Sequence, residues 1–327
     1  MRIKSTLLIV LVILFLSPLL ISAKSNVYIE EKIESHLSQL TRDYNWEITK
    51  VTSLIDSSGS KRYSHFSTTN GNNDGYVVYD HYMNEVVEFS INGNNLQNKD
   101  INTNNVYYFG PTLLYIEKED ILENVSNPND YHEKNTFISL LSEEENRVAK
   151  LSNRLKVQTD IFMPLSTVWA QLPNPLPRYT YNPNGICGST AAAMMLRYMD
   201  LYVNGNFVPT HLQSSDGVLL IKHLVPYIDG STPGSTAGEQ SAGINAYLNG
   251  KVNYSTRVDY PYDYIFYASI TQGRPFVLNL SGHPTFGYHA VTAYAYSDGW
   301  PVVNTGWLNP PTVYINPGYA SWAVVFN

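Results

Sequence analysis

Alternating apolar and polar positions predict strands in both halves of the chain. GYVVYD and EVVEFSI flank the short loop HYMN, which predicts a β-hairpin over residues 75–91. NVYYFGPTLLYIE predicts two further short strands around Gly110 and Pro111. Near the end of the chain we expect five strands, with the sequences RPFVLNL, HAVTAYAY, PVVNT, TVYI and SWAVVFN.

Helical spacing of apolar residues appears between these two groups of strands. NTFISLLSEEENRVAKLSNRLK predicts a surface helix that leads out of the first half. We also expect helices from Cys187 through TAAAMMLRYMDLYV, around GEQSAGINAYLNG, and in DYIFYASITQG. Helices followed by an antiparallel sheet are typical of the α+β class, so this is the fold class we expect for the second half.

The N-terminus has the layout of a secretory signal peptide. Arg2 and Lys4 precede an apolar run over residues 6–21, and small residues follow it. A retained membrane anchor is the alternative, but the run is short for a bilayer and contains Pro18. We therefore expect residues 1–23 to be removed, and the mature protein to be secreted with no membrane contact.

Charge divides the remaining chain into two parts. Residues 24–160 carry 21 acidic and 13 basic side chains, whereas residues 161–327 carry seven and six. Such a change in composition favours two modules, which we place at residues 24–157 and 158–327. The net charge of −7 and the lack of a basic cluster argue against a nucleic-acid partner.

The chain has one cysteine, Cys187, in the stretch NPNGICGSTAAAMML. A single thiol cannot form an internal disulfide. Its predicted place at a helix start favours the thiolate, because free N–H groups and the helix dipole point towards it. The alternative is a buried structural cysteine.

A cysteine nucleophile needs a base, and His289 is the best-placed histidine because it begins an alternating strand. His283 lies in a loop before a proline, and His211 and His223 have no strand pattern around them. Asn304, on the following strand, can orient the imidazole across a hairpin; a turn-capping asparagine is the alternative.

An oxyanion formed at the thiol needs hydrogen-bond donors. The Cys187 N–H can supply one, and a side-chain amide upstream commonly supplies another. Gln171, sixteen residues before the cysteine, is the candidate for this second donor. An ordinary loop position explains Gln171 equally well.

The order Gln171, Cys187, His289, Asn304 resembles the papain-like cysteine peptidases. GICGSTAAAMML is similar to their catalytic-helix motif, GYHAVTAYAY to their histidine segment, and NTGW to their asparagine strand with Trp307 as a shield. The resemblance covers roughly residues 167–327 and is strongest to the secreted bacterial branch, near streptopain and the bacteriocin-leader peptidases. It implies hydrolysis of protein or peptide substrates with no cofactor and no metal.

The same resemblance implies that the acidic first half is a propeptide that inhibits the second half within one chain, so that the enzyme is made as a zymogen. A permanent accessory domain is the alternative. Two other functions stay open: a cell-wall peptidoglycan amidase or endopeptidase, and a non-catalytic secreted binding protein on the same fold. The gap from Gln171 to Cys187 is longer than in papain, which weakens the assignment of Gln171.

Overall fold

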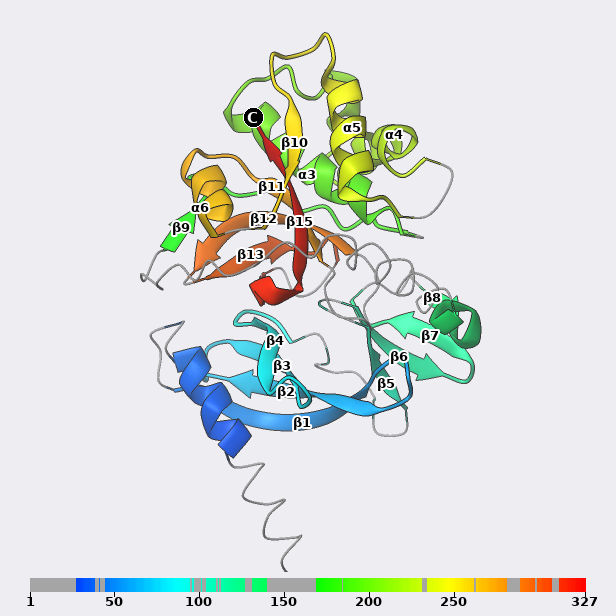
Figure 1. The fold of residues 1–327 in the computed structure, drawn as a ribbon, viewed down its shortest axis with the longest axis vertical. Coiled ribbons are helices and arrows are strands. Elements are labelled where there is room, and N and C mark those ends of the chain that lie inside the picture. Colours follow the sequence, from blue (N-terminus) through cyan, green and yellow to red (C-terminus); the bar gives the residue numbers. More distant parts are fainter. Residues whose placement is uncertain are drawn as a thin grey trace, which may run out of the picture.

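A computed structural model of the chain describes the following residues: 28–38, 41, 45–94, 96, 101, 104–109, 111, 113–126, 131–139, 169–183, 185–230, 234–261, 263–280, 289–297, 299–307 and 312–327. The architecture is a mixed α+β fold in which several helices pack against one large sheet (Figure 1). This confirms the α+β class. The predicted signal peptide, the joint between residues 157 and 158, and His283 lie outside the described residues.

Among the described residues, nine strands precede Cys187 in the chain. Their bounds are β1 Glu47–Ile55, β2 Lys61–Thr69, β3 Asp74–Asp80, β4 Glu85–Ser90, β5 Val106–Tyr108, β6 Leu114–Lys118, β7 Ile121–Asn124, β8 Tyr131–Glu133 and β9 Trp169–Gln171. Two helices, over residues 28–38 and 134–139, flank the first eight of them. The predicted hairpin is confirmed, because β3 and β4 pair across the loop from Asp80 to Glu85. The predicted strands around Gly110 and Pro111 are β5 and β6, which also pair.

The second half contains four α-helices, two 3₁₀ turns and six strands among the described residues. Their bounds are α3 Cys187–Tyr202, η1 Thr210–Leu212, α4 Val218–Ile228, α5 Ala237–Leu248, β10 Thr256–Asp259, α6 Asp263–Thr271, β11 Phe276–Leu280, β12 His289–Ser297, β13 Trp300–Asn304, β14 Val313–Ile315, η2 Pro317–Tyr319 and β15 Ala320–Phe326. The three helices and five strands predicted from the sequence are all present. Helix α4 was not predicted, because Pro226 interrupts its apolar pattern. No helix in the described part of the chain is long and apolar enough to cross a membrane.

One continuous sheet runs through both halves. Its order is β10-β15-β11-β12-β13-β14-β4-β3-β2-β1-β5-β6-β7-β8, with β9 added beside β12. The junction is the antiparallel pair β14–β4, in which Tyr314 lies opposite Phe89 and their rings stack at 4.4 Å between centroids. Asn316 extends the junction, since its backbone N–H and side-chain amide donate to the carbonyls of Val87 and Val86. Backbone and side-chain contacts therefore join the two halves, although their charge compositions differ.

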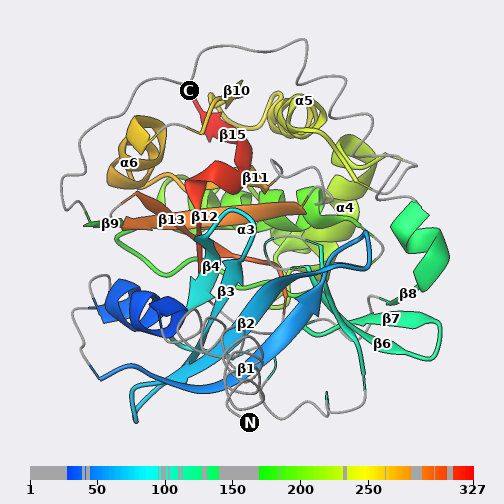
Figure 2. The ribbon, with the colours of Figure 1, turned by 60° about the horizontal axis from the view of Figure 1, so that its bottom comes forward.

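Helix α3 lies along β12 and β11, with α4 on its other side (Figure 2). Its residues from Cys187 to Leu196 are all buried, because small Ser, Thr and Ala side chains let the helix approach the sheet closely. A hydrogen bond from Thr292 Oγ1 to the Ala191 carbonyl (3.0 Å) fixes the helix against β12. This packing sets the first turn of α3 beside the start of β12.

Candidate active site

Cys187 is the first residue of α3, and its side chain is 8% exposed. Thr190, one turn further along, donates to the carbonyls of Tyr181 (2.9 Å) and Ile186 (3.1 Å). These two bonds hold the loop that precedes the cysteine against the first turn of the helix. The thiol is thus fixed at a helix start, as the sequence predicts.

The sulfur meets strand β12 at the residue that follows His289. The Ala290 N–H donates to Cys187 Sγ with 3.4 Å between nitrogen and sulfur. This N–H is accessible because the pairing of β12 with β13 ends at Thr292 and Asn304, two residues further along the strand. The end of β13 therefore leaves room for the cysteine beside the start of β12.

His289 is 2% exposed and is held by the turn after β13. Its Nε2 lies 3.1 Å from the Thr305 carbonyl oxygen, and its ring stacks on Trp307 at 5.1 Å between centroids and 9° between planes. A carbonyl oxygen can only accept, so Nε2 carries a proton. Nδ1 is then the basic nitrogen of the neutral ring, as a general base requires.

The β12–β13 register explains why Trp307, rather than Asn304, faces the histidine. A bulge between Ala293 and Ala295 shifts the pairing, so that Thr292 lies opposite Asn304. Continued from there, position 289 falls opposite position 307. The separation of fifteen residues suits a hairpin, but the tight turn between Ser297 and Trp300 sets Asn304 opposite Thr292, three residues along β12 from His289.

Asn304 still shapes the site through the turn that follows it. Its side chain is 5% exposed, and Oδ1 accepts from the Gly306 N–H at 3.0 Å. Gly306 adopts φ +74°, which suits glycine, and the resulting turn presents the Thr305 carbonyl to the imidazole. The acceptor that meets His289 is thus a backbone carbonyl held by the asparagine turn.

The structure does not bring Gln171 to the cysteine. Gln171 is exposed, and it pairs with Ala295, five residues along β12 from Ala290. Five strand residues span roughly 15 Å, which is beyond the reach of a glutamine side chain. No local pattern predicts this, because the pairing of β9 with β12 joins segments more than a hundred residues apart.

Asn182 is a buried amide in the loop before Cys187 that the sequence interpretation did not select. It lies five residues before Cys187 and is 2% exposed. Its Nδ2 is 3.6 Å from the position that a Cβ atom on Gly306 would occupy, and Thr190 borders the same position. The signal for it was present in the loop NPNGIC, where Pro183 and Gly185 favoured the interpretation of a simple turn.

Burial raises the pKa of the Cys187 thiol to about 11; the charge of Asp229 also raises it, and the Ala290 N–H opposes the rise. Near neutral pH an isolated thiol in this position stays protonated. It becomes a nucleophile only when a base accepts its proton, and His289 directly precedes Ala290, whose N–H meets the sulfur.

The other described histidines of this half lie elsewhere. His211 is exposed in η1, and His223 packs on α4 against the rings of Tyr227 and Tyr247. Among the described residues, no group of three or more His, Cys, Asp or Glu side chains could hold a metal ion.

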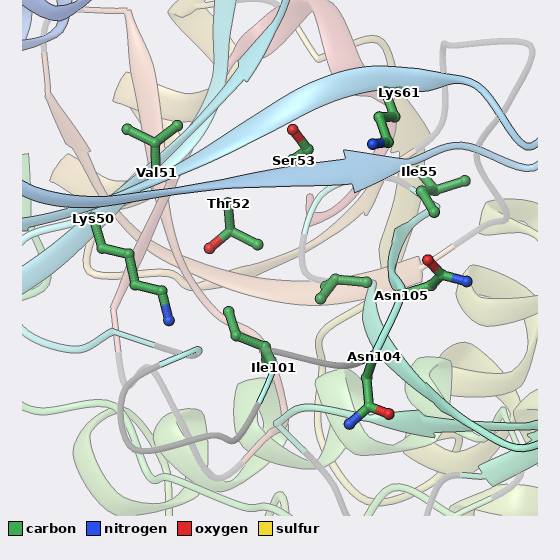
Figure 3. A pocket seen from close by; sticks show the side chains of 10 residues that line it. Lys50, Val51, Thr52, Ser53, Ile55, Lys61, Ile101, Asn104 and Asn105 are labelled. Atoms are coloured by element: carbon green, nitrogen blue, oxygen red, sulfur yellow. The ribbon is translucent and has the colours of Figure 1, made fainter.

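A pocket in the N-terminal half does not coincide with this site. A pocket of about 300 Å³ lies in the N-terminal half between β1 and the segment leading into β5, with Lys50, Thr52 and Ile101 among its lining residues (Figure 3). It contains neither a thiol nor a histidine, so it lacks the groups that nucleophilic hydrolysis needs.

Comparison with known proteins does not assign this chain to a family. No protein-family model matches the chain, and no curated protein matches it. Among solved structures, a provisionally assigned C39-like peptidase from Bacillus anthracis aligns with 49% of this chain and 98% of its own, at 14% identity and a TM-score of 0.34. A match at this level does not establish a shared fold.

Proposed function

We propose that the protein is a cysteine peptidase of the papain-like type, with Cys187 as nucleophile and His289 as general base. One observation carries the proposal: the only thiol of the chain, at the start of α3, meets the N–H beside a buried histidine whose Nε2 is fixed by a carbonyl. A cysteine with only a structural role would require neither the buried histidine nor the carbonyl that holds its ring.

The chemistry follows from these groups. The thiol proton passes to Nδ1 of His289 while sulfur attacks the carbonyl carbon of the scissile amide. The tetrahedral oxyanion collapses, the C–N bond breaks, and the imidazolium proton goes to the leaving amine, which leaves a thioester on Cys187. Water then attacks the thioester as His289 accepts its proton, and the acid product and free thiol are released.

The proposal is tested by hydrolysis of a quenched fluorescent peptide library, with the purified protein assayed before and after alkylation by iodoacetamide. Turnover should fall in proportion to labelling of Cys187, with one label per chain. Full turnover after complete labelling would contradict the proposal.

Within this mechanism Asn182, rather than Gln171, is the candidate side-chain donor to the oxyanion, alongside the Cys187 N–H. Replacing Asn182 by Ala should lower kcat by about 10²–10³ with little change in KM. Replacing Gln171 by Ala should change kcat less than about threefold, because the side chain is exposed and far along β12.

Peptide turnover by the two purified variants measures this difference. A large loss in Gln171→Ala together with a small loss in Asn182→Ala would reverse the assignment. Circular dichroism of both variants separates loss of the donor from loss of the fold.

We further propose that the chain is secreted after removal of residues 1–23 and is made as a zymogen with an N-terminal propeptide. The acidic composition of the first half and its pairing with β14 through β4 support this arrangement. The secreted active form should begin between about residues 146 and 165, where the charge composition of the sequence changes. N-terminal sequencing tests this, and an active species that begins at Lys24 would refute it.

A further inference from the structure

The helix that carries Cys187 is capped by a residue from another helix. Its own N-cap residue, Ile186, makes no side-chain cap. Instead Asp229, directly after α4, accepts from the Ser189 N–H at 3.1 Å and from the Ser189 hydroxyl. A carboxylate thus satisfies a free N–H of the first turn, as an N-cap side chain ordinarily does.

Asp229 begins a buried chain of hydrogen bonds that reaches the sheet. Ser235 Oγ donates to Asp229 Oδ1 at 2.7 Å, and Gln240 Nε2 donates to the Ser235 carbonyl at 3.0 Å. Gln240 and Asn279 exchange two amide hydrogen bonds of 2.9 Å each. Asn279 of β11 lies opposite Ala290, whose N–H meets the sulfur. The network therefore connects the helix of the nucleophile to the strand of the base.

The carboxylate lies directly against the backbone beside the cysteine. A Cβ atom on Gly188 would lie 3.1 Å from Asp229 Oδ1 and 2.3 Å from Ser235 Oγ, so only glycine fits there. Asp229 is 4% exposed. In such a buried position two negative charges repel each other far more strongly than they do in water.

The charged and titratable groups around the thiol come from three elements. Asp229 faces it from the end of α4, His289 of β12 directly precedes the Ala290 N–H that meets the sulfur, and Glu239 at the start of α5 acts on Asp229. Lys222 of α4 lies over the ring of Tyr181, 5.3 Å from its centroid. Burial raises the pKa of Asp229, and hydrogen bonds from Ser189 and Ser235 oppose that rise.

We propose that Asp229 is a positioning residue of the catalytic dyad, which holds the first turn of α3 in place and restrains the ionisation of Cys187 through its negative charge. This inference rests on the proposed function, because it assigns Cys187 as the nucleophile. Thiolate formation then depends on the proton being taken by His289.

Asp229→Asn tests the charge with little change of shape, since the amide oxygen can still accept from the Ser189 N–H. The measurement is the rate of Cys187 alkylation by iodoacetamide against pH in the full chain. Its midpoint should move down by about one pH unit, because a like charge has been removed. Asp200→Asn is the matched control: Asp200 lies near the other end of α3, is buried, and accepts from the Val208 N–H at 2.9 Å. It should lower the thermal midpoint without moving the alkylation midpoint.

Ser235→Ala provides a second variant that keeps the carboxylate and removes only one donor to it. The remaining charge is then less compensated, so the alkylation midpoint should move up. An unchanged or raised midpoint in folded Asp229→Asn would overturn the inference. If Asp229→Asn does not fold, an unchanged or lowered midpoint in Ser235→Ala would overturn it.

These outcomes are distinct from failure of the proposed function, since alkylation is measured without a peptide substrate. Peptide hydrolysis with no shift in either variant would reject the role of Asp229 alone. The expected shifts in a protein without hydrolysis would reject the peptidase alone.

Discussion

Replacing Cys187 by Ala should abolish peptide hydrolysis and leave the protein folded. The chain has no other thiol, so no neighbouring sulfur can replace the nucleophile. Loss of a catalytic nucleophile lowers kcat by about 10⁶ in enzymes of this kind. The small change in volume should cost only about 1 kcal/mol of stability. Peptide turnover and thermal unfolding, measured on the same preparation, give the two readouts.

Cys187→Ser is the matched variant, because it keeps the shape of the side chain and removes the sulfur. It should be as inactive as Cys187→Ala, since a serine hydroxyl ionises far less readily than a thiol. Appreciable turnover by carefully purified Cys187→Ala protein would exclude a cysteine peptidase. Loss of folding in both variants would instead indicate a structural cysteine.

Replacing His289 by Ala should lower turnover at neutral pH by several orders of magnitude and slow the alkylation of Cys187. Burial raises the pKa of this thiol to about 11, so without a base about one molecule in 10⁴ carries a thiolate at pH 7. Because the raised pKa disfavours the anion, the alkylation rate of the variant should climb only as pH rises towards 11. A free cysteine titrates near 8.5, so the burial of Cys187 moves the expected profile upward.

His283→Ala and His211→Ala are the controls for the base, and both should leave the alkylation profile nearly unchanged. Asn304→Ala should fall between them and His289→Ala, because Asn304 acts through the turn that carries the Thr305 carbonyl. If His283→Ala moved the profile and His289→Ala did not, the assignment of the base would be wrong even with Cys187 as nucleophile.

Local patterns predicted those parts of the fold that local interactions determine. The β3–β4 hairpin has a short loop between two alternating runs, and α3 has an Ala-rich start with no breaker in its interior. Strand β1 was missed because most of its side chains are at least partly exposed, so no alternation marks it. The β4–β14 pairing joins segments more than two hundred residues apart, and no local pattern predicts such a contact.

The residues of the candidate site differ in the same way: local patterns predicted some of them, and long-range packing determines the others. Cys187 and His289 begin a helix and a strand, and those starts could be found in the sequence. The position of Asn304 relative to His289 depends on the register of the β12–β13 hairpin, and the distance of Gln171 from the thiol depends on which strand β9 joins. Asp229 is linked to α3 only through tertiary packing, so its sequence neighbours gave no indication of its role.

The most direct measurement of the central claim is capture of the acyl-enzyme. The purified protein is mixed with an activated peptide ester, quenched in acid within one turnover, and mapped by mass spectrometry. We expect one acyl group on Cys187 in the wild-type protein, and far slower acylation in His289→Ala at neutral pH. Turnover of the ester with Cys187 free of acyl groups, or an acyl group on another residue, would contradict the account.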